Sequence, residues 1–257
     1  MSLRYVYGIA PAPAAPEVER AAIVGIDGSE VRAITERDLA AVTSDLAESE
    51  WGDAILNEHV RDLDWLTPRA AAHQEVNARA LEIAGALIPL SFGVLYRDDE
   101  RVRAMLGEGH DTHARKLADL RGKGEWVVTV TRDGAAVPGM TGDLAALDRE
   151  IASSEPGRAY LLEKRRTSVA EAAAERADED AARQAFDALA AVSERLYREP
   201  VAHGGPDVVA LRLSLLAPRN TATVERAIAG VTEDLGRSGY RVRASGPWPA
   251  YRFGSLP

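Results

Sequence analysis

The sequence predicts an α+β protein of two domains, residues 1–121 and residues 122–257. Three observations lead to this prediction. Apolar residues alternate with polar ones near both ends of the chain, which is typical of half-buried strands. Amphipathic helical segments separate these strands. The chain of 257 residues is also long for a single compact core and comfortable for two.

The N-terminal domain is expected to contain a small antiparallel sheet. The segment Leu3 to Ile9 alternates as a strand does, and short β-like runs follow at residues 22–26, 31–34 and 39–43. The dipeptide Asp27-Gly28 joins the first two of these runs and is a strong signal for a tight hairpin turn.

Helices are expected to cover this sheet. Asp53 is a suitable N-cap for a first helix, and Thr67 followed by proline predicts the start of a second, which ends at Gly85. Residues 87–96 then predict a buried strand, and Asp98-Asp99-Glu100 places negative charge at the start of a further helix.

The C-terminal domain is expected to be a ferredoxin-like unit with extra long helices, because its elements follow the order β, α, short β, β, α, β. Its long helical region is interrupted once, at Glu155-Pro156-Gly157. Part of this region carries almost only Ala and charged residues, which predicts an arm that projects into solvent. The segments are residues 126–131, 144–198, 209–215, 220–235 and 240–244.

Composition excludes several classes of function. The chain has no cysteine, so disulfides, thiolate nucleophiles and Cys-based zinc sites are excluded. A net charge of −9 argues against nucleic acid as a partner, since phosphate is bound by clustered Lys and Arg. No apolar run approaches the roughly 20 residues of a membrane span. We expect a cytoplasmic protein.

The histidines are the only candidates for catalysis or metal binding, and none completes a motif. His110 and His113 have helical i, i+3 spacing, but no carboxylate stands at the spacing that a metal site needs. His73 lies beside the apolar face of its helix without a recognisable nucleophile. No phosphate-binding glycine loop or nucleophile elbow occurs either. We expect no catalytic centre, no cofactor and no metal.

Two charged clusters lie in the long helical region. Arg158, Lys164, Arg165 and Arg166 form a basic cluster that suits a solvated face and an acidic partner equally. The acidic cluster is read as a solvated face in preference to a recognition surface; its members are Glu171, Glu175, Asp178, Glu179 and Asp180.

The tail Gly246 to Phe253 is unusual for a chain end because it is aromatic and stiffened by two prolines. Such a segment loses little conformational entropy when it docks. We therefore expect Trp248, Tyr251 and Phe253 to form an interdomain tail, with Trp248 and Tyr251 packed across the junction of the two domains.

The tail sequence GPWPAYRF also resembles the C-terminal signature GPWPPY-F of the gas vesicle protein F/L family (GvpF/GvpL). Further blocks match that family in order. The chain departs from the family at Ser91, where Arg is usual, and at Ala250, which replaces a proline. The matching blocks are YVYGI at 5–9, a helical His73, IPLSFG at 88–93, GKGEW at 122–126 and GRAYL at 157–161, ahead of Lys164.

This resemblance implies an accessory protein of gas vesicle formation, located in the cytoplasm and at the vesicle. Its partners would be the hydrophobic shell subunit and other accessory proteins. The candidate contact surfaces are the charge-rich arm at residues 163–198 and the region of Phe92, with Phe186, Leu189 and Leu196 as the apolar contacts of the arm. A regulatory ligand-binding module and a hydrolase that uses His73 remain as alternatives.

Overall fold

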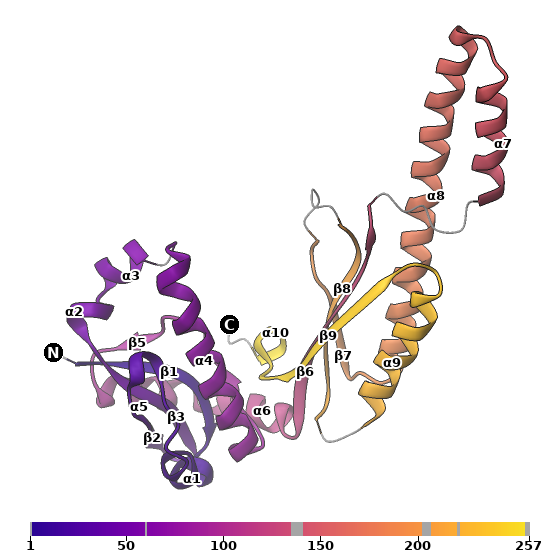
Figure 1. Cartoon of the computed structure of the whole chain (residues 1–257). Coiled ribbons are helices and arrows are strands. Elements are labelled where there is room, and N and C mark those ends of the chain that lie inside the picture. The colour runs from indigo at the N-terminus through magenta and orange to yellow at the C-terminus, as the bar shows by residue number, and fades with distance from the viewer. Residues whose placement is uncertain (1, 60, 135–140, 202–206, 220–221, 255–257) are drawn as a thin grey trace. The chain divides into compact units, whose positions relative to one another are not determined.

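The computed structural model describes residues 2–59, 61–134, 141–201, 207–219 and 222–254 (Figure 1). It divides into two compact units. The first unit comprises Met1–Glu125, Pro218–Asn220 and Pro247–Pro257, and the second comprises Trp126–Ala217 and Thr221–Gly246. The aromatic tail thus belongs to the first unit, whereas the sequence analysis assigned it to the C-terminal domain.

The sheet of the first unit is built around β1 (Ser2–Pro11), most of which is buried. β3 (Leu39–Ala47) pairs antiparallel with one edge of β1, and β2 (Val31–Glu36) pairs antiparallel with β3. The short strands β4 (Ile88–Pro89) and β5 (Leu95–Tyr96) lie on the other edge of β1. The predicted strands at 3–9, 31–34 and 39–43 are therefore present.

Two predicted strands of this unit are wrong. In residues 22–26 only Val24 pairs, through an isolated bridge to Glu30. The turn at Asp27 and Gly28 has the positive φ values, 52° and 76°, that its sequence predicts, but the adjoining segment is too short for a strand. The run at 87–96 splits into β4 and β5 because Gly93 takes a φ of 89° between them.

Most helices of the first unit cover this sheet. α4 (Leu63–Ala84) begins one turn earlier than Thr67, because the Asp62 carboxylate caps it by accepting from the backbone N–H groups of Asp64 and Trp65. It ends at Gly85, which adopts the left-handed conformation that the sequence predicts. The remaining helices are the 3₁₀ turns η1 (Ala12–Ala14) and η2 (Ile26–Gly28), α1 (Ala15–Arg20), α2 (Glu48–Trp51), α3 (Asp53–His59), α5 (Asp99–Glu108), α6 (His110–Leu120) and α10 (Tyr251–Gly254).

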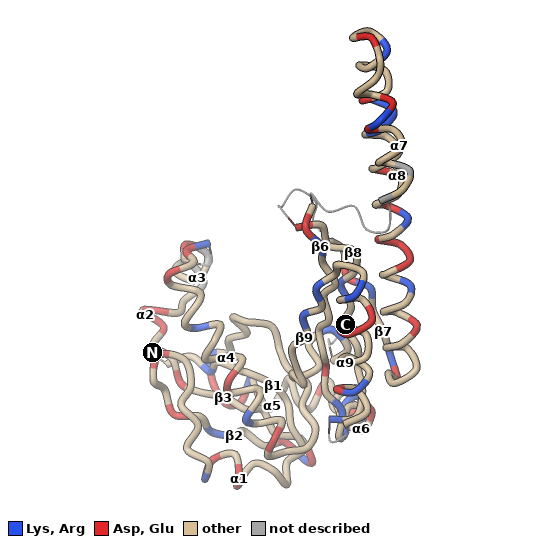
Figure 2. Tube along the Cα trace, turned by 45° about the vertical axis from the view of Figure 1, so that its right-hand side comes forward, with Lys and Arg blue, Asp and Glu red and all other residues tan. Residues whose placement is uncertain are grey.

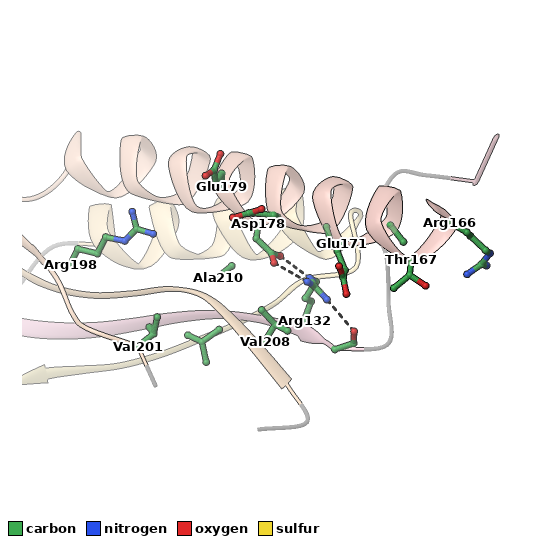
Figure 3. Close-up of a pocket in the computed structure, with 15 residues that line it drawn as sticks. Arg132, Arg166, Thr167, Glu171, Asp178, Glu179, Arg198, Val201, Val208 and Ala210 are labelled. Atoms are coloured by element: carbon green, nitrogen blue, oxygen red, sulfur yellow. Dashed lines mark hydrogen bonds and ion pairs between the residues drawn. The ribbon is translucent and has the colours of Figure 1, made fainter. Parts of the chain in front are cut away.

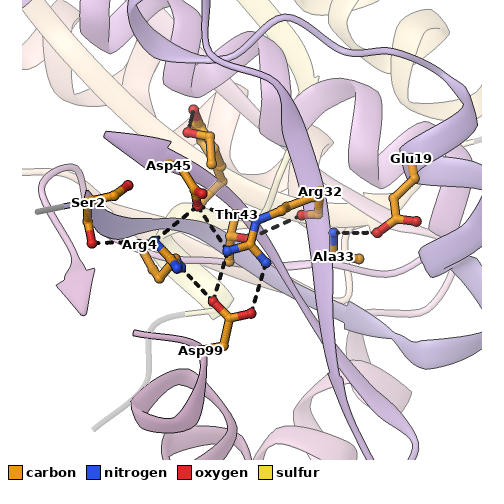
Figure 4. A network of polar contacts seen from close by, with 10 residues as sticks. Ser2, Arg4, Glu19, Arg32, Ala33, Thr43, Asp45 and Asp99 are labelled. Atoms are coloured by element: carbon orange, nitrogen blue, oxygen red, sulfur yellow. Dashed lines mark hydrogen bonds and ion pairs between the residues drawn. The ribbon is translucent and has the colours of Figure 1, made fainter. Parts of the chain in front are cut away.

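A charged network fixes the start of α5 to the sheet (Figure 4). Asp99 accepts from Arg4 Nε at 2.5 Å and from Arg32 Nη2 at 2.8 Å, and Arg32 also reaches Asp45. The two guanidinium groups hold the pKa of the Asp99 carboxyl well below its usual range, the bond from Arg32 having the larger effect. These side chains are partly exposed, so the network orients α5 more than it stabilises the fold.

The sheet of the second unit has the strand order β7-β8-β6-β9. The strands are β6 (Lys123–Asp133), β7 (Arg195–Arg198), β8 (Asp207–Pro218) and β9 (Arg241–Trp248), and the helices are α7 (Thr141–Ala152), α8 (Pro156–Ala190) and α9 (Ala222–Gly236). This order and connectivity are those of a ferredoxin-like unit with α7 inserted. The break at residues 153–155 lies where Glu155-Pro156-Gly157 predicts it.

The core of the second unit is aliphatic. Valines of β6 and leucines of β8 pack against alanines and Leu189 of α8 and against Val224 and Val231 of α9. The helical prediction for residues 144–198 fails at its end. α8 stops at Ala190, and Arg195–Arg198 pairs antiparallel with Leu213–Leu216 of β8 because Leu196 completes the same core.

α7 and the first half of α8 form an arm (Figure 1), and Figure 2 shows residues of both charges along it. The predicted position of the arm is wrong: the Ala-rich part at residues 171–183 packs on the sheet through Ala181 and Ala182. Arg166 forms an ion pair with Asp148, and Arg158 forms another with Glu150 at 2.8 Å, so charges join the two helices along their length. Within the described residues, no helix has the length and apolar character that crossing a membrane requires.

Candidate partner-binding site

The second unit carries a groove between α8 and the first half of β8 (Figure 3). Its volume is about 550 Å³. Small apolar side chains form much of its lining, from Ala170 and Ala174 of α8 and from Val208 and Val209 of β8. β7 pairs with the edge of β8 at Leu213–Leu216, and Val208, Val209 and Ala210 of β8, which line the groove, lie before this paired stretch.

One buried ion pair closes the base of the groove. Arg132 of β6 is 5% exposed, and its Nε and Nη2 donate to the two Asp178 oxygens at 2.7 and 2.8 Å. The Tyr240 hydroxyl donates to the same carboxylate at 2.9 Å. The pKa of Arg132 is raised by Asp178, and burial raises the pKa of Tyr240. Arg132 and Tyr240 both donate to Asp178, so this cluster has a structural role and ties β6 to α8.

Acidic side chains border the groove on the α8 side. Glu171, Glu175 and Glu179 are exposed and line the groove. Arg198, the last residue of β7, also lines the groove. The predicted acidic cluster is thus divided: Asp178 is bound to Arg132, and the glutamates form a solvent-facing rim over an apolar base.

The groove continues along α8 to Phe186. A second hollow of about 510 Å³ shares Glu179 and Arg198 with the first and is lined further by Ala182, Arg183, Phe186 and Leu211. Phe186 is 38% exposed. We call the two hollows together the α8 groove, and the second of them its Phe186 end.

Of the four predicted partner-contact residues, Phe186 alone lies in this groove. Leu189 is fully buried in the core of the second unit, and Leu196 packs against the same core. Phe92 lies in the first unit among aromatic rings, 6.0 Å from Tyr5 and 5.9 Å from Trp51 between ring centroids. The apolar stripe of α8 looked too narrow to be buried because alanines, which let a helix approach a sheet closely, form much of it.

The aromatic tail docks on the first unit through Tyr251. The Asn77 side-chain amide donates to the Tyr251 hydroxyl at 3.1 Å, and burial raises the pKa of Tyr251 to about 12. Lys116 Nζ donates to the Phe253 carbonyl at 3.2 Å. The sequence analysis expects Trp248 to be packed. Its side chain is instead 39% exposed at the end of β9.

His73 has a structural environment. It is 3% exposed, with Nδ1 2.8 Å from the Tyr5 hydroxyl and Nε2 3.0 Å from the Asn77 side-chain nitrogen. Burial lowers the pKa of His73 to about 4. The ring is therefore neutral and surrounded by phenol, amide and aromatic groups, which is the setting of a core histidine.

The other two candidate histidines lie on α6 but in different environments. His110 is bound to the carboxylates of Asp38 and Asp111, whose hydrogen bonds raise its pKa. His113 is 6% exposed, and burial lowers its pKa. No group of three or more His, Cys, Asp or Glu side chains in the described part of the chain is arranged to hold a metal ion.

Comparison with known proteins decides the family. The model of the gas vesicle synthesis protein GvpL/GvpF family matches residues 3–255. The chain belongs to this family. Gas vesicle protein L of a Streptomyces species is 31% identical over 90% of this chain and 86% of its own length. Gas vesicle protein L2 of Halobacterium salinarum is 26% identical over 97% of this chain and 90% of its own.

Solved structures of the GvpL/GvpF family have the same fold. The crystal structure of GvpF from Anabaena superposes with a TM-score of 0.71 at 16% identity, over 100% of this chain and 98% of that one. GvpF from Microcystis aeruginosa gives 0.68 at 17% identity, over 99% of both chains. The resemblance and the α+β fold predicted from the sequence are thereby confirmed.

Proposed function

We propose that the protein acts during gas vesicle assembly by binding the hydrophobic shell subunit or other accessory proteins, without nucleotide, cofactor or metal. Its membership of the GvpL/GvpF family supports this proposal most strongly. A shell protein with a water-repelling face exposes a large apolar patch until it is assembled, and such a patch needs a partner that shields or positions it. We expect the protein in the cytoplasm and at the growing vesicle.

The Phe186 end of the α8 groove is the contact that we propose for such a partner. Phe186 is a large aromatic side chain, and its exposure of 38% contrasts with the buried residues around it on α8. The hollow beside it is floored by the buried side chains of Ala182 and Leu211, and Arg183 and Arg198 also line it. An aromatic anchor on an apolar base with a charged rim is the usual composition of a binding hot spot.

Capture of the shell subunit tests this assignment. The protein is immobilised and the amount of purified shell subunit that it retains is compared between the parent, Phe186→Ser and Leu63→Ser. Leu63 is 71% exposed on α4 of the first unit, so its substitution removes a comparable exposed apolar group elsewhere. We expect Phe186→Ser to weaken capture about tenfold or more, as at a hot spot, and Leu63→Ser to leave it unchanged.

Equal capture by the parent and Phe186→Ser would refute the assignment of the contact to this groove. Absence of capture by the parent, of both the shell subunit and the other vesicle proteins, would refute the proposed function itself. The environment of His73 gives no support to the hydrolase alternative, because its two ring nitrogens contact Tyr5 and Asn77 in the core.

A further inference from the structure

The face of α8 that passes over the groove changes character along its length. Tyr160, Lys164, Thr167, Glu171 and Glu175 follow one another at spacings of four, three, four and four, which places them on one helical face. All five are exposed. The first part of this face is aromatic and basic, and the second part is acidic, so the two parts are complementary to each other.

The aromatic and basic part has no partner within the described chain. Tyr160 is 57% and Leu161 67% exposed, which leaves two large apolar side chains in solvent side by side. The Lys164 ammonium lies 5.0 Å from the centre of the Tyr160 ring, and Arg165 is exposed with no carboxylate partner among the described residues. α7 packs against other positions of α8, because its acidic residues bind Arg158 and Arg166.

These cations are not explained by the stability of α8 alone. A helix N-terminus is stabilised by acidic residues in its first turn, and α8 has none there. Lys164 and Arg165 lie more than two turns beyond Pro156, the first residue of α8, where the helix dipole does not account for their charge. The acidic part, Glu171 and Glu175, borders the groove whose base is Ala170, Ala174, Val208 and Val209.

We propose that a second copy of this chain packs antiparallel along α8, so that the aromatic and basic part of each copy lies on the acidic part and groove of the other. A single register, centred between Thr167 and Ser168, places Lys164 opposite Glu171 and Tyr160 opposite Glu175. Both contacts occur twice, as in any interface with two-fold symmetry. Tyr160 then lies over the small side chains at the base of the partner's groove.

Two-fold pairing accounts for features that are unfavourable in a single copy. It removes exposed aromatic surface from water and brings Lys164 of each copy to Glu171 of the other. It also closes on itself and stops at two chains, whereas a head-to-tail contact continues into a fibre. The Phe186 end lies beyond the paired segment on α8, so dimer formation and the proposed shell contact use different residues.

Sedimentation equilibrium of the purified full chain tests the pairing first. We expect the average mass to rise with concentration from 27.6 kDa and to level off at twice that value. High salt should weaken the association, because the paired charges are at the surface. A mass that stays at 27.6 kDa over a hundredfold concentration range would overturn the proposal.

Charge reversal then identifies the surfaces. In the basic-groove variant Glu171→Lys and Glu175→Lys are combined, and in the acidic-arm variant Lys164→Glu and Arg165→Glu are combined. We expect each variant alone to be monomeric, since like charges meet, and an equimolar mixture of the two to form dimers again. Recovery in the mixture also shows that both variants are folded. Dimers of either variant alone at the parent's affinity, or a mixture that stays monomeric, would contradict the pairing.

A matched control and a cross-link complete the test. Glu17→Lys combined with Glu225→Lys changes the net charge equally at exposed positions elsewhere and should leave dimer formation unchanged.

The chain has no cysteine, so Thr167→Cys introduces a single thiol beside the expected two-fold axis. Oxidation should join this variant into a covalent dimer much faster than Thr232→Cys on α9. Equal rates would overturn the register. Because purified protein is used, failure here leaves the shell-binding proposal untouched.

Discussion

The two units of this protein build their cores from different materials. In the first unit, polar aromatic groups contact one another in the interior, among them Tyr5, Tyr7 and His73, which are 0%, 0% and 3% exposed. In the second unit the core is formed mainly by Val, Leu and Ala, and its buried charge is the ion pair of Arg132 with Asp178. Hydrogen bonds between buried polar groups demand particular geometry, whereas packing of Ala and Leu requires only matching shape.

This difference has a consequence for function. The hydrogen bonds of Tyr5 to His73 and of Tyr7 to Ser44 are buried, so these groups are occupied within the core and do not face solvent. In the second unit one long helix uses an Ala-rich face for the core and leaves other faces exposed. The comparison suggests a structural role for the interior of the first unit and a recognition role for the surface of α8.

The strongest test of this difference between buried and exposed positions substitutes two residues that lie three positions apart on α8. Leu189 is fully buried and Phe186 is 38% exposed. We expect Leu189→Ala to lower the free energy of unfolding by about 3 kcal/mol and Phe186→Ala by less than about 1 kcal/mol, because only the first leaves a cavity. Urea unfolding followed by circular dichroism measures both. Similar losses for the two variants would mean that Phe186 is part of the core.

The tail offers a second contrast, between Tyr251 and Trp248. Tyr251 is bound to Asn77 and lies 6.3 Å from His73 between ring centroids, whereas Trp248 is 39% exposed. We expect Tyr251→Ala to cost about 2 to 3 kcal/mol of unfolding free energy and Trp248→Ala about 1 kcal/mol. The same urea titration decides the order, and a larger loss for Trp248→Ala would restore the prediction from the sequence.

The third contrast concerns pH and sets His73 against its glutamine variant. Burial lowers the pKa of His73 to about 4 in the folded protein, below 6.5 for an ordinary histidine. Below about pH 6.5 the unfolded chain binds a proton at His73 that the folded chain does not bind. The free energy of unfolding therefore decreases as the pH falls below about 6.5. Between about pH 7 and pH 5 the loss should be about 2 kcal/mol.

His73→Gln removes the titrating group and can keep a hydrogen bond to a neighbour. We expect its unfolding free energy to be lower at neutral pH but to change less between the two pH values than that of the parent. An equal pH dependence in the parent and in His73→Gln would show that other groups cause the acid loss.

Local signals in the sequence were sufficient for several elements. Gly85 ends α4 because glycine adopts the left-handed conformation without steric cost, and Pro156 begins α8 because its fixed φ suits the first helical turn. The alternation of residues 209–215 also predicted the strand β8, although Ala210 and Ser214, expected to face out, are buried. The strand at 195–198 was not, because four residues that follow a helix cannot be told from its last turn until β8 lies beside them.

The site was less predictable than the fold. An amphipathic stripe shows which residues are apolar but not which of them the sheet covers, so Leu189 and Phe186 looked alike in the sequence. The groove itself depends on Val208 of β8 lying near Ala174 of α8, a contact between residues far apart in the chain. The family, by contrast, was readable from its motifs alone.

The most direct test of the account is complementation of a vesicle-forming host from which the gene has been deleted. The strain receives the parent gene, Phe186→Ser or Leu63→Ser, and vesicles are counted by electron microscopy at equal protein levels. We expect the deletion strain to lack normal vesicles, Leu63→Ser to restore them as the parent does, and Phe186→Ser to restore far fewer. Normal vesicles in the deletion strain, or full restoration by Phe186→Ser, would contradict the account.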